Sequence, residues 1–469
     1  MLIIKRTILC LSIMGQSFFS QAQSKPNVIV VVADDLGWAD LGSHGVRTDV
    51  KTPYLDSLAM SGVQFSSGYA CAPVCVPSRA GLLTGRYPNR FGMESNDDGP
   101  LPVSELTIGD RMKSLGYVTG LVGKWHVASG SATHSEFKAI PGNEILWGDN
   151  VRITDKNLPG HRGFTEYFCG AMRNYAASFD LNGNDLKDPP VLVNSNEYRI
   201  DLQTKAALAF IRKNKENPFF LYLGYFAPHV PLEAPKVYQS SFMEIPDSIR
   251  QKGLSMIKSV DEGIGRIRLL LKDLGLAENT LIIFTSDNGA PLKEGMWDGS
   301  LNQPFVGEKG MLTDGGVRVP FIISWPDKIK SGLVFKEPVI SLDILPTAVA
   351  AAGGQIDQSW KIDGKNLLPF LTGEKNGSPH SALFWRFRSQ ASILSGSWKL
   401  IFSAPNKYYL FDMKTPGGEK ENLAEQYPSV TKRLNERLSR HADQLLPSGL
   451  PSKIWAEDEA LLNLHFNKR

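Results

Sequence analysis

Residues 28–35 read VIVVVADD, an unbroken apolar run that ends in two aspartates. A run of this kind, without polar alternation, is typical of a strand buried on both faces. Four further runs have the same form: YVTGLVGKWH (117–126), PFFLYLGYFAPH (218–229), LIIFTSDNG (281–289) and VPFIISWP (319–326). Helix-like stretches lie between such runs, at 52–62 and at 255–275. Strands that alternate with helices predict an α/β fold, with a largely parallel sheet covered by helices on both faces.

Polar residues follow these runs at the points where the strands should end. Asp34 and Asp35 end one run, and Asp287 and Asn288 end another. In a parallel sheet, ligands gather at the carboxyl ends of the strands. Carboxylates that converge there repel one another unless a cation lies among them, and all-oxygen ligands favour Ca²⁺ or Mg²⁺ over zinc. Aspartates are also common in turns, so the spacing alone leaves a metal site and a plain turn both open.

Several cations and histidines also lie next to strand ends or glycines: Arg79, Lys124, His126, His229 and Lys309. Lys124 and His126 are two residues apart on the same expected strand, so their side chains should face one side, with Trp125 on the other. Any one of them alone could be an ordinary solvated residue. Together, beside a hard-metal site, they would suit a tetrahedral anion such as phosphate or sulfate.

The 469 residues exceed the usual size of one domain. Near residue 371 the pattern of the sequence changes from long apolar runs to short alternating segments. TGEKNGSPH (372–380) reads as a linker, and the following segments alternate like a small antiparallel sheet. Five apolar residues then recur at helical spacing and predict a helix that covers this sheet: Val430, Leu434, Leu438, Ala442 and Leu445. We therefore expect a main domain at 24–370 and a small α+β subdomain at 371–469.

The first 23 residues have the order of a signal peptide. Lys5 and Arg6 precede an apolar run, and small and polar residues follow around Ala22. No later segment reaches the ~18 to 20 apolar residues of a membrane span. Without Lys5 and Arg6 the chain keeps 49 basic against 48 acidic residues, a balance that argues against a nucleic-acid binder. We expect an exported protein, periplasmic or secreted, without a membrane span.

Three cysteines remain after this segment, Cys71, Cys75 and Cys169, so at least one thiol is unpaired or has another use. A phosphatase-type thiolate loop is excluded, because Arg79 follows Cys75 by four residues instead of six. Zinc is disfavoured because no Cys-x-x-Cys pair occurs. A Cys71–Cys75 disulfide would close an awkward loop through Pro73. A Cys71–Cys169 disulfide is the simpler expectation, and it leaves Cys75 alone.

The segment CVPSR (75–79), followed by AGLLTGR (80–86), resembles the Cys-x-Pro-Ser-Arg signature of the formylglycine-dependent (type I) sulfatases of the alkaline phosphatase superfamily. Further segments resemble the blocks of this family in the same order: 27–42, 116–126, 162–170, 227–235, 281–291, 307–326 and 408–424. Asp314 departs from the Glu that is commoner in the family. The resemblance implies an alkaline phosphatase-like fold with a large mixed, mostly parallel sheet, and a small C-terminal antiparallel sheet with a helix. Residues 24–370 would then form the sulfatase catalytic domain.

The resemblance also implies roles for the residues at the strand ends. Cys75 would be oxidised to formylglycine, whose hydrated aldehyde is the nucleophile in this family. One Ca²⁺ per chain would be held by position 75 together with four side chains: Asp34, Asp35, Asp287 and Asn288. Arg79 would bond the nucleophile, and Lys124 and Lys309 would bind sulfate oxygens. His229 would protonate the leaving alcohol, and His126 would remove a proton to release sulfate.

An exported enzyme of this family is expected to act on a sulfated carbohydrate, such as a carrageenan-like polysaccharide or a glycosaminoglycan. A long polar stretch, 129–163, reads as a loop and supplies, with the residues after it, the candidate sugar contacts: His134, Arg152, His161, Arg173, Asn174 and Tyr175. A formylglycine-generating or sulfatase-maturing enzyme would be a partner. Two alternatives stay open, a phosphonate or phosphodiester hydrolase and a catalytically silent binder of sulfated glycans.

Overall fold

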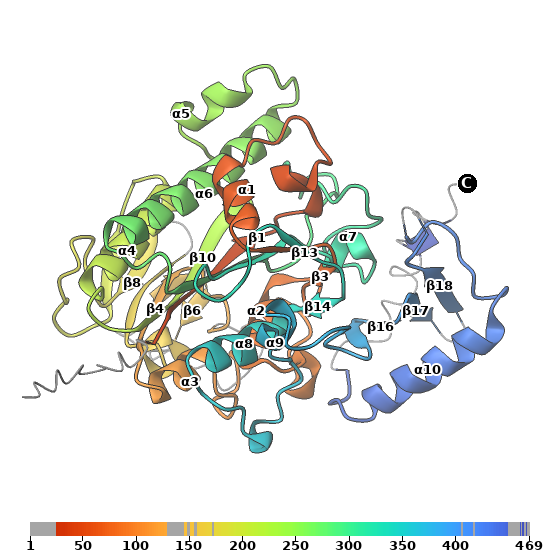
Figure 1. Cartoon of the computed structure of the whole chain (residues 1–469). Coiled ribbons are helices and arrows are strands. Elements are labelled where there is room, and N and C mark those ends of the chain that lie inside the picture. The colour runs from red at the N-terminus through yellow and green to blue at the C-terminus, as the bar shows by residue number, and fades with distance from the viewer. Residues whose placement is uncertain are drawn as a thin grey trace, which may run out of the picture.

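The computed structural model describes residues 25–128, 145–147, 151–153, 157–170, 173–404, 407–415, 418–448 and four positions near the C-terminus: 460, 462, 463 and 466. The expected signal peptide (1–23) and His134 lie outside these residues. Within them, a large mixed sheet forms the centre of the main domain, and a small antiparallel sheet lies beside it (Figure 1). The predicted fold class is confirmed.

The expected strand at 28–35 lies near the middle of the large sheet. It is β1 (Asn27–Asp34), which pairs in parallel with β10 (Phe219–Pro228) on one side and β11 (Thr280–Ser286) on the other. β10 continues in parallel to β4 (Val118–Gly123), and β4 to β7 (Glu166–Gly170). The full order of the described strands is β13-β2-β12-β11-β1-β10-β4-β7-β8-β9.

Antiparallel strands flank this parallel centre, which is why the sheet is mixed. β12 (Phe321–Ser324) runs against β11, and on the other side β8 and β9 run against their neighbours. The bounds of the outer strands are β2 Val63–Phe65, β13 Leu333–Phe335, β8 Asn174–Ala177 and β9 Val191–Asn194. Two-stranded sheets form from β3 (Gly68–Tyr69) with β14 (Val339–Ile340), and from β5 (Ile145–Trp147) with β6 (Val151–Ile153). The stretch 129–163 is thus not wholly loop, since β5 and β6 pair within it.

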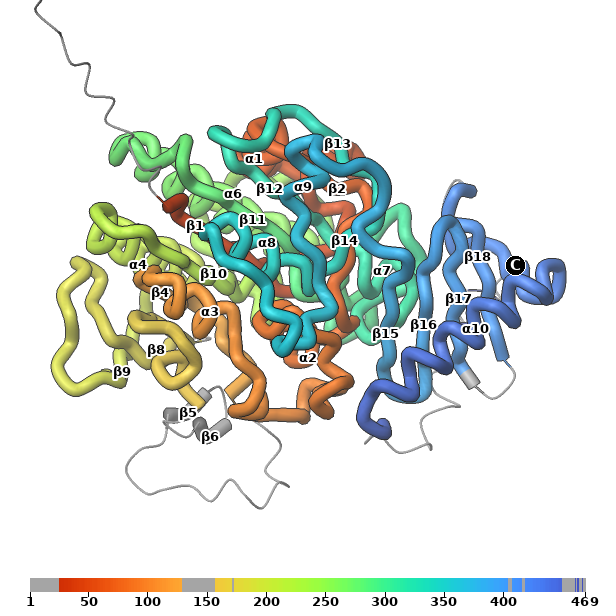
Figure 2. Tube along the Cα trace, turned by 60° about the horizontal axis from the view of Figure 1, so that its bottom comes forward, coloured from red at the N-terminus to blue at the C-terminus, as the bar shows by residue number. Residues whose placement is uncertain are grey.

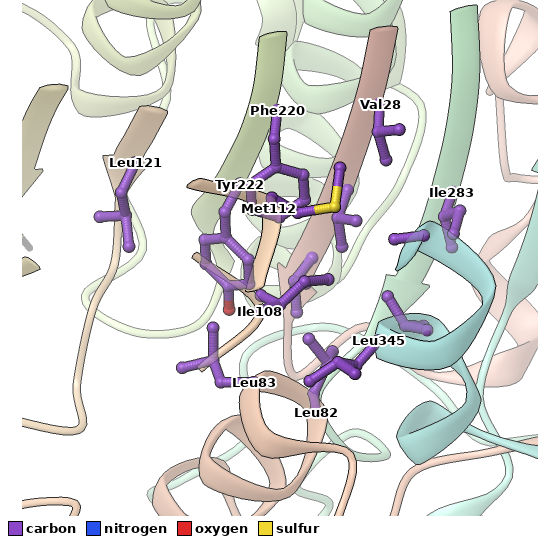
Figure 3. Close-up of a cluster of buried hydrophobic side chains, with 14 of the residues drawn as sticks. Val28, Leu82, Leu83, Ile108, Met112, Leu121, Phe220, Tyr222, Ile283 and Leu345 are labelled. Carbon is purple, nitrogen blue, oxygen red and sulfur yellow. The ribbon is translucent and has the colours of Figure 1, made fainter. Parts of the chain in front are cut away.

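Helices cover both faces of the sheet because each central strand is apolar on both sides. Val28, Val30 and Val32 of β1 point into one core, while Ile29 and Val31 point into the other. The first core is closed by α2 (Cys75–Thr84), α3 (Ile108–Ser114) and α8 (Ile344–Ala351). The second is closed by α1 (Pro53–Met60), α4 (Arg199–Lys213) and α6 (Ser248–Asp273). Figure 3 shows strand residues such as Phe220 facing Met112 and Leu345 in the first core.

The small C-terminal sheet has the predicted antiparallel form. Its strands are β15 (Leu383–Phe387), β16 (Gln390–Ser395), β17 (Trp398–Ala404) and β18 (Lys407–Asp412), in that order. Leu434 and Leu438 of α10 (Pro428–Ala442) pack on one face of it, as expected. The helix ends at Ala442, so Leu445 lies beyond it. The opposite face meets the main domain near α7 (Asp314–Val317), where β15 lies closest (Figure 2). The main domain also contains two short α-helices, α5 (Lys236–Gln239) and α9 (Leu368–Leu371).

The expected Cys71–Cys169 disulfide is wrong. Cys71, Cys75 and Cys169 are all free and buried. Cys71 Sγ lies 3.4 Å from the carbonyl oxygen of Ser78 and belongs to the cluster under β15. Cys169 lies on β7 in the first core, so the two thiols belong to different packing clusters.

Among the described residues, no helix has the length and apolar character of a membrane span.

Candidate active site

The carboxyl ends of two neighbouring central strands, β1 and β11, bring the predicted oxygen ligands together. Asp34 ends β1, Asp35 follows it with a left-handed backbone (φ 67°), and Asp287 and Asn288 follow β11. All four are buried. The backbone amide of Asp35 donates to Asp287 Oδ1 at 3.1 Å, which links the two strand ends.

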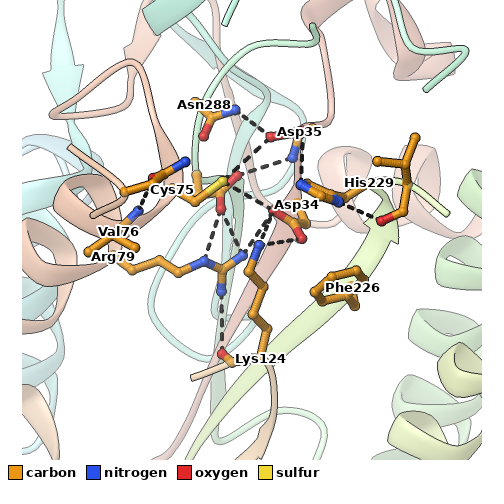
Figure 4. A network of polar contacts seen from close by, with 12 residues as sticks. Asp34, Asp35, Cys75, Val76, Arg79, Lys124, Phe226, His229 and Asn288 are labelled. Carbon is orange, nitrogen blue, oxygen red and sulfur yellow. Dashed lines mark hydrogen bonds and ion pairs between the residues drawn. The ribbon is translucent and has the colours of Figure 1, made fainter. Parts of the chain in front are cut away.

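Cys75 completes this cluster from the first residue of α2. Its Sγ lies 3.6 Å from Asp34 Oδ1 and 3.7 Å from Asp35 Oδ1 (Figure 4). One ligand atom from each of Asp34, Asp35, Cys75 and Asp287 lies within 4.8 Å of every other. Segments from three distant parts of the chain therefore converge on one point.

The donor set of this cluster fits a metal ion. Asn288 Nδ2 donates to Asp35 Oδ1 at 2.6 Å, while Asn288 Oδ1 is buried and has no hydrogen-bond partner among the described residues. A buried carbonyl oxygen without a donor is costly unless something binds it. The free oxygen and the three carboxylates together form a site that a hard cation could occupy.

Three cations neutralise the carboxylates in the structure. Lys124 Nζ lies 2.8 and 2.7 Å from the two oxygens of Asp34, and Lys309 Nζ lies 2.7 Å from Asp35 Oδ2. Arg79 donates from Nε to Asp287 Oδ2 at 2.9 Å, and its Nη2 forms an ion pair with the same oxygen at 2.8 Å. Each carboxylate thus has its own basic partner, as buried charges require.

The balance of burial and charge differs between the carboxylates. Burial alone would raise the pKa of Asp34, but Lys124, His229 and Arg79 hold that pKa well below its ordinary value. For Asp287, burial prevails over the attraction of Arg79 and raises the pKa. Burial, followed by the nearby Asp287 charge, also raises the pKa of the Cys75 thiol well above its ordinary value. Cys75 is therefore held as a neutral thiol, which is a poor nucleophile.

Lys124 and His126 do not share a strand face, because β4 ends at Gly123. Lys124 reaches the cluster, Trp125 is buried and donates from Nε1 to the carbonyl of Asn157 at 3.0 Å, and His126 has a left-handed backbone (φ 60°). Burial, then the charges of Lys124 and Arg79, hold the pKa of His126 well below its ordinary value. Its Nδ1 is buried without a hydrogen-bond partner in the described part of the chain. A neutral imidazole with a free nitrogen can accept a proton.

His229 follows β10 and approaches the cluster from the side opposite Cys75 (Figure 4). Its Nδ1 lies 2.7 Å from the carbonyl oxygen of Val230, which can only accept, so Nδ1 carries the hydrogen. Its Nε2 lies 3.8 Å from Asp35 Oδ2. The side chain is 25% exposed, so His229 lies between the buried cluster and solvent.

The candidate sugar contacts differ in their exposure to solvent. The structure describes the backbone of Arg152 on β6 but not its side chain, and His161 is exposed on the turn before β7. Arg173 and Asn174 are exposed at the start of β8. Because β8 runs against β7, they lie at the same edge of the sheet as the cluster. Tyr175 is fully buried and packs on Phe168, with ring centroids 4.9 Å apart. Tyr175 therefore presents no exposed surface to a sugar in this structure, and its expected sugar contact stays a prediction.

Three residues at the site were not singled out from the sequence. Tyr222 Oη accepts from Arg79 Nη1 at 3.3 Å. The Phe226 ring lies between Lys124 Nζ, at 4.8 Å from the ring centroid, and the His229 ring, at 5.1 Å. Arg199 packs against the same ring from α4. For Tyr222, the one indication in the sequence is that alternate side chains along 218–229 face the same side of the sheet. No local sequence pattern indicates that Arg199 lies near the site.

A mostly parallel sheet whose central strands end in buried oxygen ligands, with lysines, an arginine and histidines around them, defines an alkaline phosphatase-like hydrolase of a tetrahedral anion ester. The chain belongs to the sulfatase family, since residues 26–354 match the family model Sulfatase. Residues 306–444 also match the model described as N-sulphoglucosamine sulphohydrolase, C-terminal. The protein is therefore an enzyme that hydrolyses sulfate esters.

Known relatives agree with this assignment. The chain is 30% identical to the steryl-sulfatase of Homo sapiens, over 82% of this chain and 78% of that protein. It is 31% identical to the N-acetylgalactosamine-6-sulfatase of Rattus norvegicus, over 81% and 71%. The crystal structure of Ps i-CgsB in complex with k-i-k-neocarrahexaose superposes with a TM-score of 0.77 at 29% identity, covering 94% of this chain and 98% of that chain.

Proposed function

We propose that this protein is an exported, formylglycine-dependent sulfatase that uses Ca²⁺ and removes sulfate from a sulfated carbohydrate. The observation that carries the proposal is the position of Cys75. Its Sγ lies 3.6 Å from a carboxylate oxygen of Asp34 and 3.7 Å from one of Asp35, both buried. Cys75 is also the first residue of α2, within the sequence CVPSR. A neutral, buried thiol has no evident use there, whereas a modified side chain does.

The nucleophile would come from position 75 after oxidation to formylglycine, whose hydrated form supplies a reactive oxygen. Arg79 donates to Asp287 and to Tyr222 through separate nitrogens, so its guanidinium is fixed in orientation beside position 75. Its role would be to hold the nucleophilic oxygen and to balance the carboxylates. A maturing enzyme that oxidises this cysteine would be an obligatory partner.

Ca²⁺ would be held by Asp34, Asp35, Asp287 and Asn288, with position 75 as a further ligand. The all-oxygen donor set and the free Oδ1 of Asn288 support a hard cation. The ion would polarise the sulfate group as a Lewis acid. Lys124 and Lys309 now pair with Asp34 and Asp35. If the ion held the carboxylates, both ammonium groups would be free to bind sulfate oxygens.

The two histidines suit two different proton transfers. His229 keeps Nδ1 on the Val230 carbonyl and presents Nε2 toward the cluster, so a proton on Nε2 would pass to the leaving oxygen of the sugar. His126, with its lowered pKa and a free Nδ1, would take a proton from position 75 so that sulfate is released. An acid and a base at separate positions can act at separate steps.

Two of the similar proteins support a sulfated sugar as the substrate class, whereas the steryl-sulfatase is named for a steryl substrate. The N-acetylgalactosamine-6-sulfatase acts on a sulfated amino sugar by its name, and Ps i-CgsB binds a carrageenan-type hexaose. Arg173 and Asn174, exposed at the cluster's edge of the sheet, are the best-placed candidate contacts in the described chain, followed by His161. Arg152 and His134 stay in the proposal as predictions from sequence.

The test is sulfate release from a panel of carrageenan and glycosaminoglycan oligosaccharides by protein co-expressed with a formylglycine-generating enzyme. We expect release from at least one member, with the lost group located by NMR. A matched series of phosphate and phosphonate monoesters tests the alternative, since Silicibacter pomeroyi SpPMH, a phosphonate monoester hydrolase, shares the fold. Binding of an oligosaccharide without any release would instead identify a silent glycan binder.

A further inference from the structure

Arg199 is a buried arginine with no place in the reaction described above. It begins α4 and its side chain is 1% exposed. Its Nη2 donates to the carbonyl oxygen of His229 at 2.9 Å and to that of Pro231 at 2.7 Å. One guanidinium nitrogen thus ties together two carbonyls of the loop that follows β10.

These two carbonyls bracket the one that orients the imidazole. Between them lies Val230, whose carbonyl oxygen accepts from His229 Nδ1 at 2.7 Å. Of three consecutive carbonyls, the outer two are fixed by Arg199 and the middle one fixes the His229 ring. If the outer pair were released, the peptides on both sides of Val230 could rotate, and its carbonyl would leave Nδ1.

A second contact links Arg199 to the same ring. The guanidinium lies over the Phe226 ring, 4.8 Å from its centroid, and that ring packs against His229 with centroids 5.1 Å apart. Arg199 therefore supports His229 both through the backbone and through an aromatic side chain. Planar stacking combined with in-plane donation is a property of arginine that lysine does not share.

The ion pair with Glu233 does not account for the burial of Arg199. Its acidic neighbour, Glu233, lies 3.7 Å from Nη1 and has a side chain that is 45% exposed. An exposed, loosely placed pair contributes little, whereas burying a guanidinium is costly unless hydrogen bonds compensate for the lost water. The two hydrogen bonds to the His229 loop and the stacking on Phe226 are the contacts that connect Arg199 to the site.

We propose that Arg199 is a positioning residue that holds His229 Nε2 toward the leaving oxygen. This inference rests on the proposed role of His229 as the acid. Loss of Arg199 should therefore matter most when the leaving group needs a proton. It should matter little when the leaving group is a stable anion, or when His229 itself is absent.

The test is a double-mutant cycle of Arg199→Met and His229→Ala in matured protein. With 4-methoxyphenyl sulfate, we expect Arg199→Met to lower kcat/KM about 10- to 100-fold in the wild-type background, as for other supporting residues. In the His229→Ala background the same change should cost less than about 3-fold. With 4-nitrophenyl sulfate the loss should be about 3-fold or less in both backgrounds. Arg199→Lys should restore part of the activity, since it keeps a donor.

Arg162→Met is the matched control. Arg162 is also buried and donates to three backbone carbonyls, those of Leu101, Pro102 and Glu105, in a loop without a proposed acid. Its loss should affect both aryl esters equally. Equal losses for Arg199→Met in both backgrounds, or with both esters, would overturn the positioning role while leaving the sulfatase proposal intact. No sulfate release by wild-type protein from any ester or oligosaccharide would overturn the proposed function itself.

Amide hydrogen exchange gives a readout that needs neither turnover nor metal. The amide of His229 donates to the carbonyl of Asp34 at 3.3 Å. We expect faster exchange in peptides covering 226–233 for Arg199→Met, and unchanged exchange there for Arg162→Met. Unchanged exchange at 226–233 in Arg199→Met would contradict the proposal that Arg199 holds the His229 loop in place.

Discussion

At the residue scale, the site is a set of buried charges that balance one another. Asp34 forms an ion pair with Lys124, Asp35 with Lys309, and Asp287 with Arg79. The polar ends of the apolar runs allowed these residues to be predicted from sequence, because strand ends meet at one edge of a parallel sheet. Their pairing could not be predicted, since it depends on side-chain reach across strands far apart in sequence.

Replacing the proposed nucleophile separates chemistry from folding. Cys75→Ala should lower sulfate release about 10⁶-fold, the scale of a deleted nucleophile in other hydrolases, with a melting temperature within a few degrees of wild type. Cys71→Ala is the matched control, because Cys71 is equally buried but faces Ser78 instead of the carboxylates. It should lose some stability and keep its turnover. Wild-type turnover in Cys75→Ala would rule out the mechanism.

Metal binding is tested at the same scale. A ligand that binds only the folded state stabilises it by about 2.7 kcal/mol at a concentration of 100 times its Kd. Adding Ca²⁺ to chelator-treated protein should therefore raise the melting temperature, and Asp35→Ala should abolish the rise. Asp97→Ala, an exposed carboxylate change, should keep it. A calcium-dependent rise that persists in Asp35→Ala would place the ion elsewhere.

At the element scale, helices and strands followed the hydrophobic pattern, and the errors fell at their ends. α6 begins at Ser248, seven residues before the expected start, and β4 ends at Gly123, one residue before the lysine that was expected on it. The strand ends where the chain must turn into the site, and the left-handed backbone of His126 is part of that turn. Apolar periodicity carries no information on such turns, so the directions of Lys124 and His126 were not predictable.

A buried carboxyl between two helices should make stability depend on pH. Asp261 Oδ1 of α6 accepts from the amide of Leu55 in α1 at 2.7 Å, and burial raises the Asp261 pKa to about 7. The folded state then holds a proton that the unfolded state has lost, so stability falls as pH rises toward 7. Asn cannot ionise, so Asp261→Asn should gain about 2 to 3 kcal/mol relative to wild type between about pH 5 and pH 8.

Denaturant unfolding at both pH values checks this prediction. Asp273→Asn, an exposed change on the same helix, is the control and should show little dependence on pH. A relative stability of Asp261→Asn that stays constant across this range would show that Asp261 is ionised in the folded protein throughout, and would contradict the prediction.

At the scale of the whole molecule, the small sheet is joined to the main domain by a buried ionic cluster. Lys399 Nζ of β17 lies 2.8 Å from Asp314 Oδ1 and 2.7 Å from Glu419 Oε1. Glu419 in turn accepts from the backbone amide of Asp314 at 2.7 Å. Asp314 is the position where the family more often has Glu, so the departure seen in the sequence lies at the domain junction. The sequence predicted the two sheets but not this link, because Asp314 lies 85 residues from Lys399 and 105 residues from Glu419 along the chain, and no motif marks the three residues.

Breaking this cluster should destabilise the protein. Lys399→Met leaves the buried Glu419 without its cation and leaves Asp314 with Arg318 alone, and breaking a buried pair in this way typically costs about 3 to 5 kcal/mol. Lys432→Met, an exposed change on α10, should stay within about 0.5 kcal/mol of wild type. The unfolding midpoints in guanidinium chloride provide the comparison. Equal midpoints for the two variants would show that the cluster does not hold the junction.

The chemical state of residue 75 tests the central claim most directly. Mass spectrometry of the tryptic peptide that contains this residue, taken from protein that releases sulfate, should show formylglycine in a fraction that rises with specific activity across preparations. The same peptide carrying only an unmodified cysteine thiol, from fully active protein, would contradict the account.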